Sequence, residues 1–263
     1  MANEKSVLFD IDPDLSGRIL AQPGAFKDAA VKLGAVATAS TVLGLASTAA
    51  FGEGAKLPRK ITEVLNFALT LEYLEDEFYR TALGASDLIP SETRATFETI
   101  GKHEAAHVEV LKSALGDHAV KKPEFDFTAK GAFKDVFSNY KTFLALSQAF
   151  EDTGVRAYKG QAGNLMGNDE LLTVALQIHS VEARHAAQVR LIRGQPAWII
   201  SNSRGDLPEA TQPIYDGEAD FTQGGADIKD LGGLSADALS GAFDEPLSKG
   251  KVLAIAKMFI KPA

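Results

Sequence analysis

Hydrophobic residues recur three or four positions apart along four stretches of the chain, with polar residues between them. This spacing is typical of helices that bury one face. The four stretches are residues 61–82, 90–115, 138–159 and 168–193. Gly116 follows the second stretch as a stop signal, and Asn168 is suited to capping the start of the fourth. The pattern therefore predicts four long helices.

The connections between these stretches alternate in length. The first and second stretches are joined by a short link, and so are the third and fourth. Residues 117–137 form a longer connection between the two pairs, with Pro123 and Gly131 inside it. Short links make the joined helices antiparallel neighbours. Two hairpins with a long crossover predict an all-α protein with a ferritin-like four-helix bundle over residues 57–193.

The chain before the bundle is expected to form a separate N-terminal part over residues 1–56. Residues 1–25 are polar and acidic, which predicts an irregular arm, and residues 26–51 lead into small apolar side chains. We expect this apolar helix to pack on protein, and a membrane contact through residues 33–51 is the alternative. The acidic lead and the distance from Met1 count against a cleaved export signal.

Beyond the fourth stretch the composition changes. Residues 194–263 are rich in Gly, Pro, Asp and Asn, yet they carry large apolar residues such as Trp198, Tyr215 and Phe221. The chain also has an amphipathic stretch over residues 252–260. Because disordered tails hold few such residues, we predict a mostly irregular C-terminal extension that wraps on the bundle.

A pattern of carboxylates and imidazoles occurs twice on the predicted helices. The first copy holds Glu72, Glu104 and His107, and the second holds Glu151, Glu182 and His185. The leading glutamates are 79 residues apart and the Glu-x-x-His pairs are 78 apart. The apolar surroundings follow the same offset, since Phe97 and Ile100 correspond to Ala175 and Ile178. The offsets therefore indicate one unit present in two copies, as expected of a duplication.

Helix geometry explains how the six residues could converge. The residues of each Glu-x-x-His pair share one helix face, about 4.5 Å apart along the axis. Apolar neighbours place Glu72 and Glu151 on the core side of their helices. Buried carboxylates repel one another and are costly to desolvate, and a pair of divalent cations would resolve the conflict. Each residue alone is more simply a structural one, but together they predict a dimetal site.

The net charge and the amino-acid composition limit which partners and metals are compatible with this site. A net charge of −8 without a Lys/Arg cluster argues against a nucleic-acid partner. The chain has no cysteine, which excludes thiolate metal sites, iron–sulfur clusters and cysteine nucleophiles. Redox chemistry would therefore belong to a metal. Carboxylates with two imidazoles suit iron and manganese, so we expect two Fe or two Mn ions.

The motifs resemble those of bacterial ferritin-like domain proteins related to plant desiccation-related proteins. The resemblance covers residues 57–260 and rests on residues 71–79, 103–107, 182–185 and 242–247. It implies six metal ligands, namely Glu72, Glu104, His107, Glu151, Glu182 and His185. Glu104 and Glu182 are the expected bridges between the ions. Glu75, whose counterpart is Gly154, is an additional ligand or a neighbour of the site.

Two tyrosines are candidate catalytic residues near the metals. Tyr79 and Tyr158 follow Glu72 and Glu151 by seven residues, almost two helical turns, so each could reach the polar centre. The alternative is that both are ordinary core tyrosines with a hydrogen-bond partner.

The leading functional hypothesis is a stress-protective oxidoreductase of the ferroxidase or peroxidase type, whose partners are metal ions and dioxygen or peroxide. The alternative is a non-enzymatic stress or desiccation scaffold that self-associates or binds the cell envelope. We expect a homo-oligomer, and the long N-terminal and C-terminal extensions argue against a ferritin cage. Residues 26–32 lack the arginine pair of the export signal that family members often have, so we expect a cytoplasmic protein, with an exported or envelope-associated one as the alternative.

Overall fold

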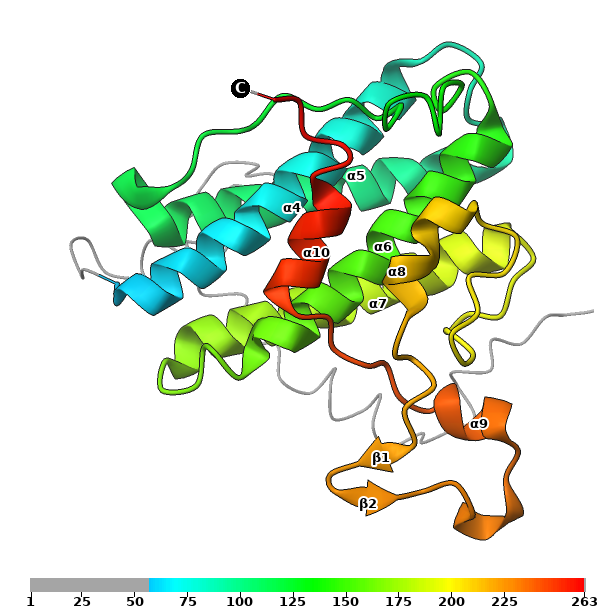
Figure 1. The fold of residues 1–263 in the computed structure, drawn as a ribbon. Helices are drawn as coiled ribbons and strands as arrows, with labels where there is room; N and C mark the ends of the chain where they lie inside the picture. Colours follow the sequence, from blue (N-terminus) through cyan, green and yellow to red (C-terminus); the bar gives the residue numbers. More distant parts are fainter. Residues whose placement is uncertain (1–56, 263) are drawn as a thin grey trace, which may run out of the picture. The chain divides into compact units, whose positions relative to one another are not determined.

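A computed structural model describes residues 57–262, and four long helices form its centre (Figure 1). These helices are α4 (Arg59–Gly84), α5 (Ser91–Leu115), α6 (Tyr140–Ala162) and α7 (Asp169–Ile192). The all-α class and the four-helix bundle are thus confirmed. The arm and the apolar helix predicted within residues 1–56 lie outside the described residues.

The helices pair as the loop lengths predicted. α4 packs along α5, and α6 packs along α7, while the contacts between the two hairpins are fewer. The crossover begins with the short helix η2 (Gly116–His118) and runs along the outside of the bundle to the start of α6 (Figure 1). Within it, Phe125 forms an isolated antiparallel bridge with Ile260 near the C-terminus. The crossover is therefore held against the C-terminal residues by backbone hydrogen bonds.

Local side-chain contacts determine where the helices begin and end. The side chain of Asn168 accepts a hydrogen bond of 3.0 Å from the backbone N–H of Leu171, which confirms it as the cap of α7. Asn139 caps α6 in the same way through the N–H of Lys141. α5 ends at Leu115, and the following Gly116 has a φ of 53°, which lies in the left-handed region that glycine adopts readily. These caps satisfy backbone groups that would otherwise lack partners.

The core has two parts that differ in chemistry. One is rich in aromatic rings, and Phe78 contacts Phe143 and Phe150 within it at centroid distances of 5.3 and 5.0 Å. The other is mainly aliphatic and gathers around residues such as Leu65 and Leu111. Burial of each of these large side chains contributes roughly 1.5–3 kcal/mol to stability.

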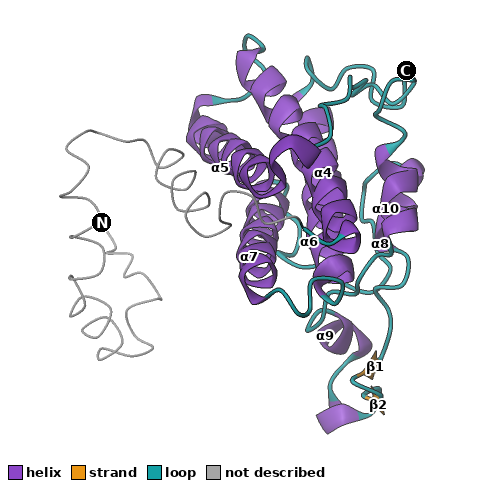
Figure 2. Cartoon of the chain, turned by 90° about the vertical axis from the view of Figure 1, so that its left-hand side faces the viewer, coloured by secondary structure: helices purple, strands orange, loops and turns teal. Residues whose placement is uncertain are grey.

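The C-terminal extension packs along the bundle and continues beyond its end. Its elements are η3 (Glu209–Thr211), α8 (Gln212–Tyr215), β1 (Thr222–Gln223), β2 (Ala226–Asp227), η4 (Leu231–Gly233), α9 (Ala236–Ser240) and α10 (Lys249–Ala256). α8 and α10 both contact α6, and Figure 2 shows them on the outside of the bundle. β1 and β2 form a small antiparallel hairpin with Thr222 opposite Asp227. The extension is thus an ordered wrap with little regular structure.

A buried arginine of α6 ties the extension to the bundle. Arg156 is 1% exposed, and its Nε donates to the carbonyl of Glu245 at 2.7 Å. The same guanidinium donates to the carbonyl of Asp216 at 3.2 Å and pairs with the carboxylate of Glu218 at 2.5 Å. Since a buried charge is stable only when it is fully paired, these contacts fix the path of the extension.

None of the helices within residues 57–262 combines the length and the apolar character that a membrane span requires.

Candidate metal centre

The six predicted ligands lie together in the middle of the bundle. α4 contributes Glu72, α6 contributes Glu151, and α5 and α7 each contribute one Glu-x-x-His pair. The four glutamates are 0% exposed, and the two histidines are nearly as buried. The structure therefore brings all six side chains into one water-poor centre.

Their ligand atoms fall into two overlapping groups within the described chain. One group is Glu72, Glu104, His107 and Glu182, and the other is Glu104, Glu151, Glu182 and His185. In each group these atoms lie within 4.8 Å of one another, as the ligands of one metal ion do. Glu104 and Glu182 belong to both groups. This is the arrangement expected of two neighbouring ions with two bridging carboxylates.

The δ nitrogen of each histidine faces the carboxylates. His107 Nδ1 lies 3.1 Å from Glu72 Oε2 and 3.2 Å from both Glu104 Oε2 and Glu182 Oε1. His185 Nδ1 lies 2.9 Å from Glu104 Oε1 and 3.3 Å from Glu151 Oε2. The two imidazoles are therefore placed to offer Nδ1 as the ligand atom, one in each group.

Although some of these atoms lie close together, several of them form no hydrogen bond of suitable geometry with any of the residues 57–262. They are Glu104 Oε1, Glu151 Oε2, both carboxylate oxygens of Glu182, and His185 Nδ1. Buried polar atoms almost always have a partner, so this many exceptions in one place call for a missing one. Hard divalent cations fit a donor set of carboxylate oxygens and imidazole nitrogens. The residues thus fit a metal site on chemical grounds.

The pKa shifts show how much the protein alone disfavours this cluster of charges. Burial raises the pKa of Glu72 to about 7, and burial together with nearby carboxylates raises that of Glu182 well above its usual range. Burial alone would lower the pKa of His185, but the carboxylates of Glu151 and Glu104 raise it to about 11. The bare cluster therefore holds protons where metal ions would otherwise neutralise it.

The two candidate tyrosines contact ligands of the opposite hairpin. Tyr79 of α4 donates a hydrogen bond to Glu151 Oε1 of α6, and Tyr158 of α6 donates one to Glu72 Oε1 of α4. Burial and the adjacent carboxylates raise both phenol pKa values well above 10.0. Both tyrosines therefore remain protonated donors that hold the outer carboxylates in place.

Glu75 lies beside the centre but in neither group. It is 3% exposed, and burial together with the surrounding carboxylates raises its pKa well above the usual value. Its counterpart Gly154 provides room, because a Cβ there would lie 3.0 Å from Glu182 Oε2 and 3.4 Å from Glu75 Oε1. This favours Glu75 as a protonated neighbour of the Glu182 carboxylate.

The prediction from the sequence missed a function for His103. Its Nδ1 lies 2.9 Å from His185 Nε2, and the two rings are nearly parallel at 12°. The ring nitrogen of a ligating histidine that points away from the metal usually has such a partner, which fixes the tautomer and the ring orientation. The repeat could not reveal this role, because the counterpart of His103 is Val181.

A family model described as a ferritin-like domain matches residues 60–195, a range that spans α4 to α7 and includes all six predicted ligands. The resemblance noted from the motifs is confirmed at this level. No curated protein matches the sequence. The bacterial, desiccation-related subtype remains a prediction.

Proposed function

Because this chain belongs to the ferritin-like domain family, we propose that its bundle holds two iron or manganese ions and uses them in redox chemistry with dioxygen or peroxide. The observation that carries the proposal is the pair of buried ligand groups that share Glu104 and Glu182. A purely structural ion-pair network would need only one carboxylate for each histidine. It would therefore not account for two carboxylates that belong to both ligand groups.

Charge balance supports two divalent ions. The two groups contain four glutamates, whose ionised carboxylates carry four negative charges between them. Two divalent cations neutralise this charge, whereas a single one would leave uncompensated carboxylates in the core. We assign Glu72 and His107 to one ion and Glu151 and His185 to the other.

When bound, two such ions would supply one electron each, which reduces dioxygen with two protons to hydrogen peroxide, or peroxide with two protons to water. The chain's own residues provide the setting for this step. Tyr79 and Tyr158 hold the outer carboxylates through donated hydrogen bonds. The aromatic and aliphatic core excludes bulk water, and the protonated Glu75 lies beside the centre with a proton to donate.

Metal content and oxygen uptake test the proposal together. We expect about two Fe or Mn per chain in protein purified without chelator, and oxygen consumption when Fe(II) is added to metal-free protein. The double substitution Glu104→Ala with His185→Ala should abolish both. Glu109→Ala is the matched control, since Glu109 lies on α5 with its side chain 57% exposed and should change neither.

A folded wild-type protein that takes up neither Fe(II) nor Mn(II) would overturn the proposal. The scaffold function would then be favoured by the exposed apolar residues of the extension. Trp198 and Leu234 are 56% and 55% exposed, and they offer a surface for self-association that a minimal oxidase does not need. Oxygen uptake discriminates between the two functions, because a scaffold should show none above background.

A further inference from the structure

The two tyrosines that contact the metal ligands have very different surroundings. Around Tyr79 lie the rings of Phe78, Phe97 and Phe143, at centroid distances of 5.2, 6.2 and 6.2 Å. Phe97 and Phe143 also contact each other at 4.8 Å, and all four side chains are 0% exposed. Large aromatic rings therefore fill the core on this side of the centre.

The equivalent positions around Tyr158 carry small side chains. The repeat relates Phe78 to Ala157 and Phe97 to Ala175, and it relates Phe143 to Val64. All three of these smaller residues line one apolar cavity, together with Tyr158 itself. The absence of a phenyl ring at these three positions leaves space on this side of the centre.

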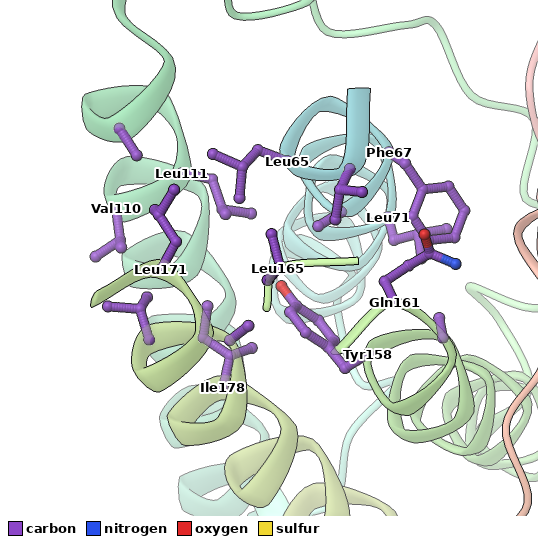
Figure 3. A pocket seen from close by; sticks show the side chains of 16 residues that line it. Leu65, Phe67, Leu71, Val110, Leu111, Tyr158, Gln161, Leu165, Leu171 and Ile178 are labelled. Carbon is purple, nitrogen blue, oxygen red and sulfur yellow. The ribbon is translucent and has the colours of Figure 1, made fainter. Parts of the chain in front are cut away.

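The cavity lies between all four helices of the bundle (Figure 3). Its lining is aliphatic except for Phe67, Tyr158 and Gln161. The amide of Gln161 is already engaged, since it donates to the carbonyl of Gly160 at 3.2 Å and accepts from Asn164 at 3.0 Å. The hydroxyl of Tyr158 is directed to Glu72. Within the described chain, the lining therefore offers little to hold a water molecule, which needs two to four polar partners.

The size of the cavity limits what it can hold. Its volume is about 20 Å³, which exceeds the roughly 10–15 Å³ that a molecule the size of water requires but is far below the roughly 150 Å³ of a cavity that binds benzene. An alkyl chain or an aromatic ring would need the core to rearrange. A diatomic, apolar gas fits both the volume and the lining.

We propose that this cavity binds dioxygen and is its route to the metal centre. The inference rests on the proposed function, because it identifies how the oxidant of that site arrives. Tyr158 forms the inner wall, and its hydroxyl contacts Glu72, which belongs to the ligand group of His107. Dioxygen therefore arrives at the ion held by Glu72 and His107, whereas the phenylalanine rings close the equivalent approach past Tyr79. Peroxide, which is polar, does not use this route.

Xenon is a suitable probe, because it occupies dry apolar cavities and needs no metal. Crystals of the metal-free protein under xenon pressure should show a xenon atom between Ala157, Ala175 and Tyr158. In Ala175→Phe, which places in α7 the residue that its counterpart Phe97 has in α5, this xenon should disappear. The matched control is Ala95→Phe, at an exposed position of α5, in which xenon should bind as in the wild type.

Oxygen kinetics provide the second arm of the test. We expect Ala175→Phe to slow the consumption of dioxygen by Fe(II)-loaded protein about tenfold or more while the metal content stays that of the wild type. Its rate with hydrogen peroxide should remain unchanged. If the phenylalanine prevents folding, Ala175→Leu gives a smaller obstruction, and circular dichroism verifies the fold of either variant.

Absence of xenon from the wild-type cavity would overturn the proposal, and so would an unchanged oxygen rate in a folded variant that excludes xenon. A failure of the proposed function gives a different result. In that case xenon would occupy the cavity of a protein that consumes no oxygen with any metal, which would support the gas site and overturn the redox function alone.

Discussion

The two hairpins of the bundle agree at the six predicted ligand positions and at the two tyrosines, and they differ at several of the positions around them. Glu72 and Glu151 correspond to each other, as do the Glu-x-x-His pairs, and their tyrosine contacts are exchanged symmetrically. In contrast, Glu75 of α4 corresponds to Gly154 of α6, and His103 of α5 corresponds to Val181 of α7. The positions that both hairpins share are the ones that a two-ion centre requires. The positions that differ face different surroundings in the two hairpins.

The clearest difference concerns charge. In the second hairpin, Asp152 and Arg190 form a buried pair with contacts of 2.9 and 2.6 Å, and Tyr215 of the extension donates to Asp152 at 2.7 Å. The counterparts of this pair are Tyr73 and Lys112, and Lys112 is partly exposed beside Glu109. The second hairpin therefore binds the extension through buried charges, and the first has no equivalent among the described residues.

The largest effect is expected at the shared positions, where several groups titrate in the same direction once metal is removed. The pKa of Glu72 rises with burial from 4.5 to about 7, and carboxylates raise that of His185 from 6.5 to about 11 against the effect of burial. Both groups hold protons more tightly in the folded state. Their contributions are complete below pH 4.5 and 6.5, and are lost as the pH rises through about 7 and about 11.

Metal-free protein should therefore become less stable between about pH 5 and pH 9, as measured by urea unfolding in the presence of a chelator. Loaded protein should show a smaller decline, because cations replace the protons. The variant Glu72→Gln with His185→Gln should have a flatter profile. Stability of the metal-free protein that increases over this range would contradict the account.

The next effect concerns the buried pair that only the second hairpin has. Arg190→Ala leaves Asp152 buried without its partner and should lower the free energy of unfolding by about 3–5 kcal/mol. Lys112→Ala removes the equivalent side chain of the first hairpin and should cost about 1 kcal/mol or less, since its ion pair is exposed. Urea unfolding of both variants measures the difference. Equal losses of unfolding free energy in the two variants would contradict the claim that the buried ion pair stabilises the second hairpin more than the exposed pair stabilises the first.

A smaller and more local effect is expected at His103. His103→Ala removes the partner of His185 Nε2, so the ion assigned to His185 should bind about 10–100-fold more weakly while the other is little affected. Mn(II) titration followed by calorimetry would resolve the two steps. Val181→Ala, at the corresponding position of α7, is the control and should leave both affinities unchanged. A uniform loss at both sites would argue against a contact specific to His185.

The smallest effect is expected at Gly154, where the second hairpin lacks the carboxylate that Glu75 provides in the first. A Cβ there would approach Glu182 Oε2 to 3.0 Å, so Gly154→Ala should displace this carboxylate slightly and weaken metal binding less than about tenfold. Gly163→Ala is the control, because nothing lies within 4 Å of its added Cβ. Equal metal affinities for the two variants would show that Gly154 is not needed to accommodate Glu182.

The helices and the convergence of the six side chains could be predicted because they depend on periodicity and on an internal repeat. The cap at Asn168 depends on local sequence and was predicted as well. His103 was missed because the repeat has no second copy of it. The role of Arg156 was also missed, since its partners are the carboxylate of Glu218 and the backbone carbonyls of residues 214, 216 and 245, whose positions depend on the path of the extension. Such non-local contacts leave no periodic signal in a single sequence.

The central claim is that the positions shared by the two hairpins form a two-ion centre. Anomalous diffraction from crystals of Fe- or Mn-loaded protein, collected at the absorption edge of the metal, tests it most directly. We expect two anomalous peaks, one beside His107 and one beside His185, with Glu104 and Glu182 in contact with both. Well-ordered crystals of protein exposed to excess metal that show no peak among these residues, or a single peak shared by both histidines, would contradict it.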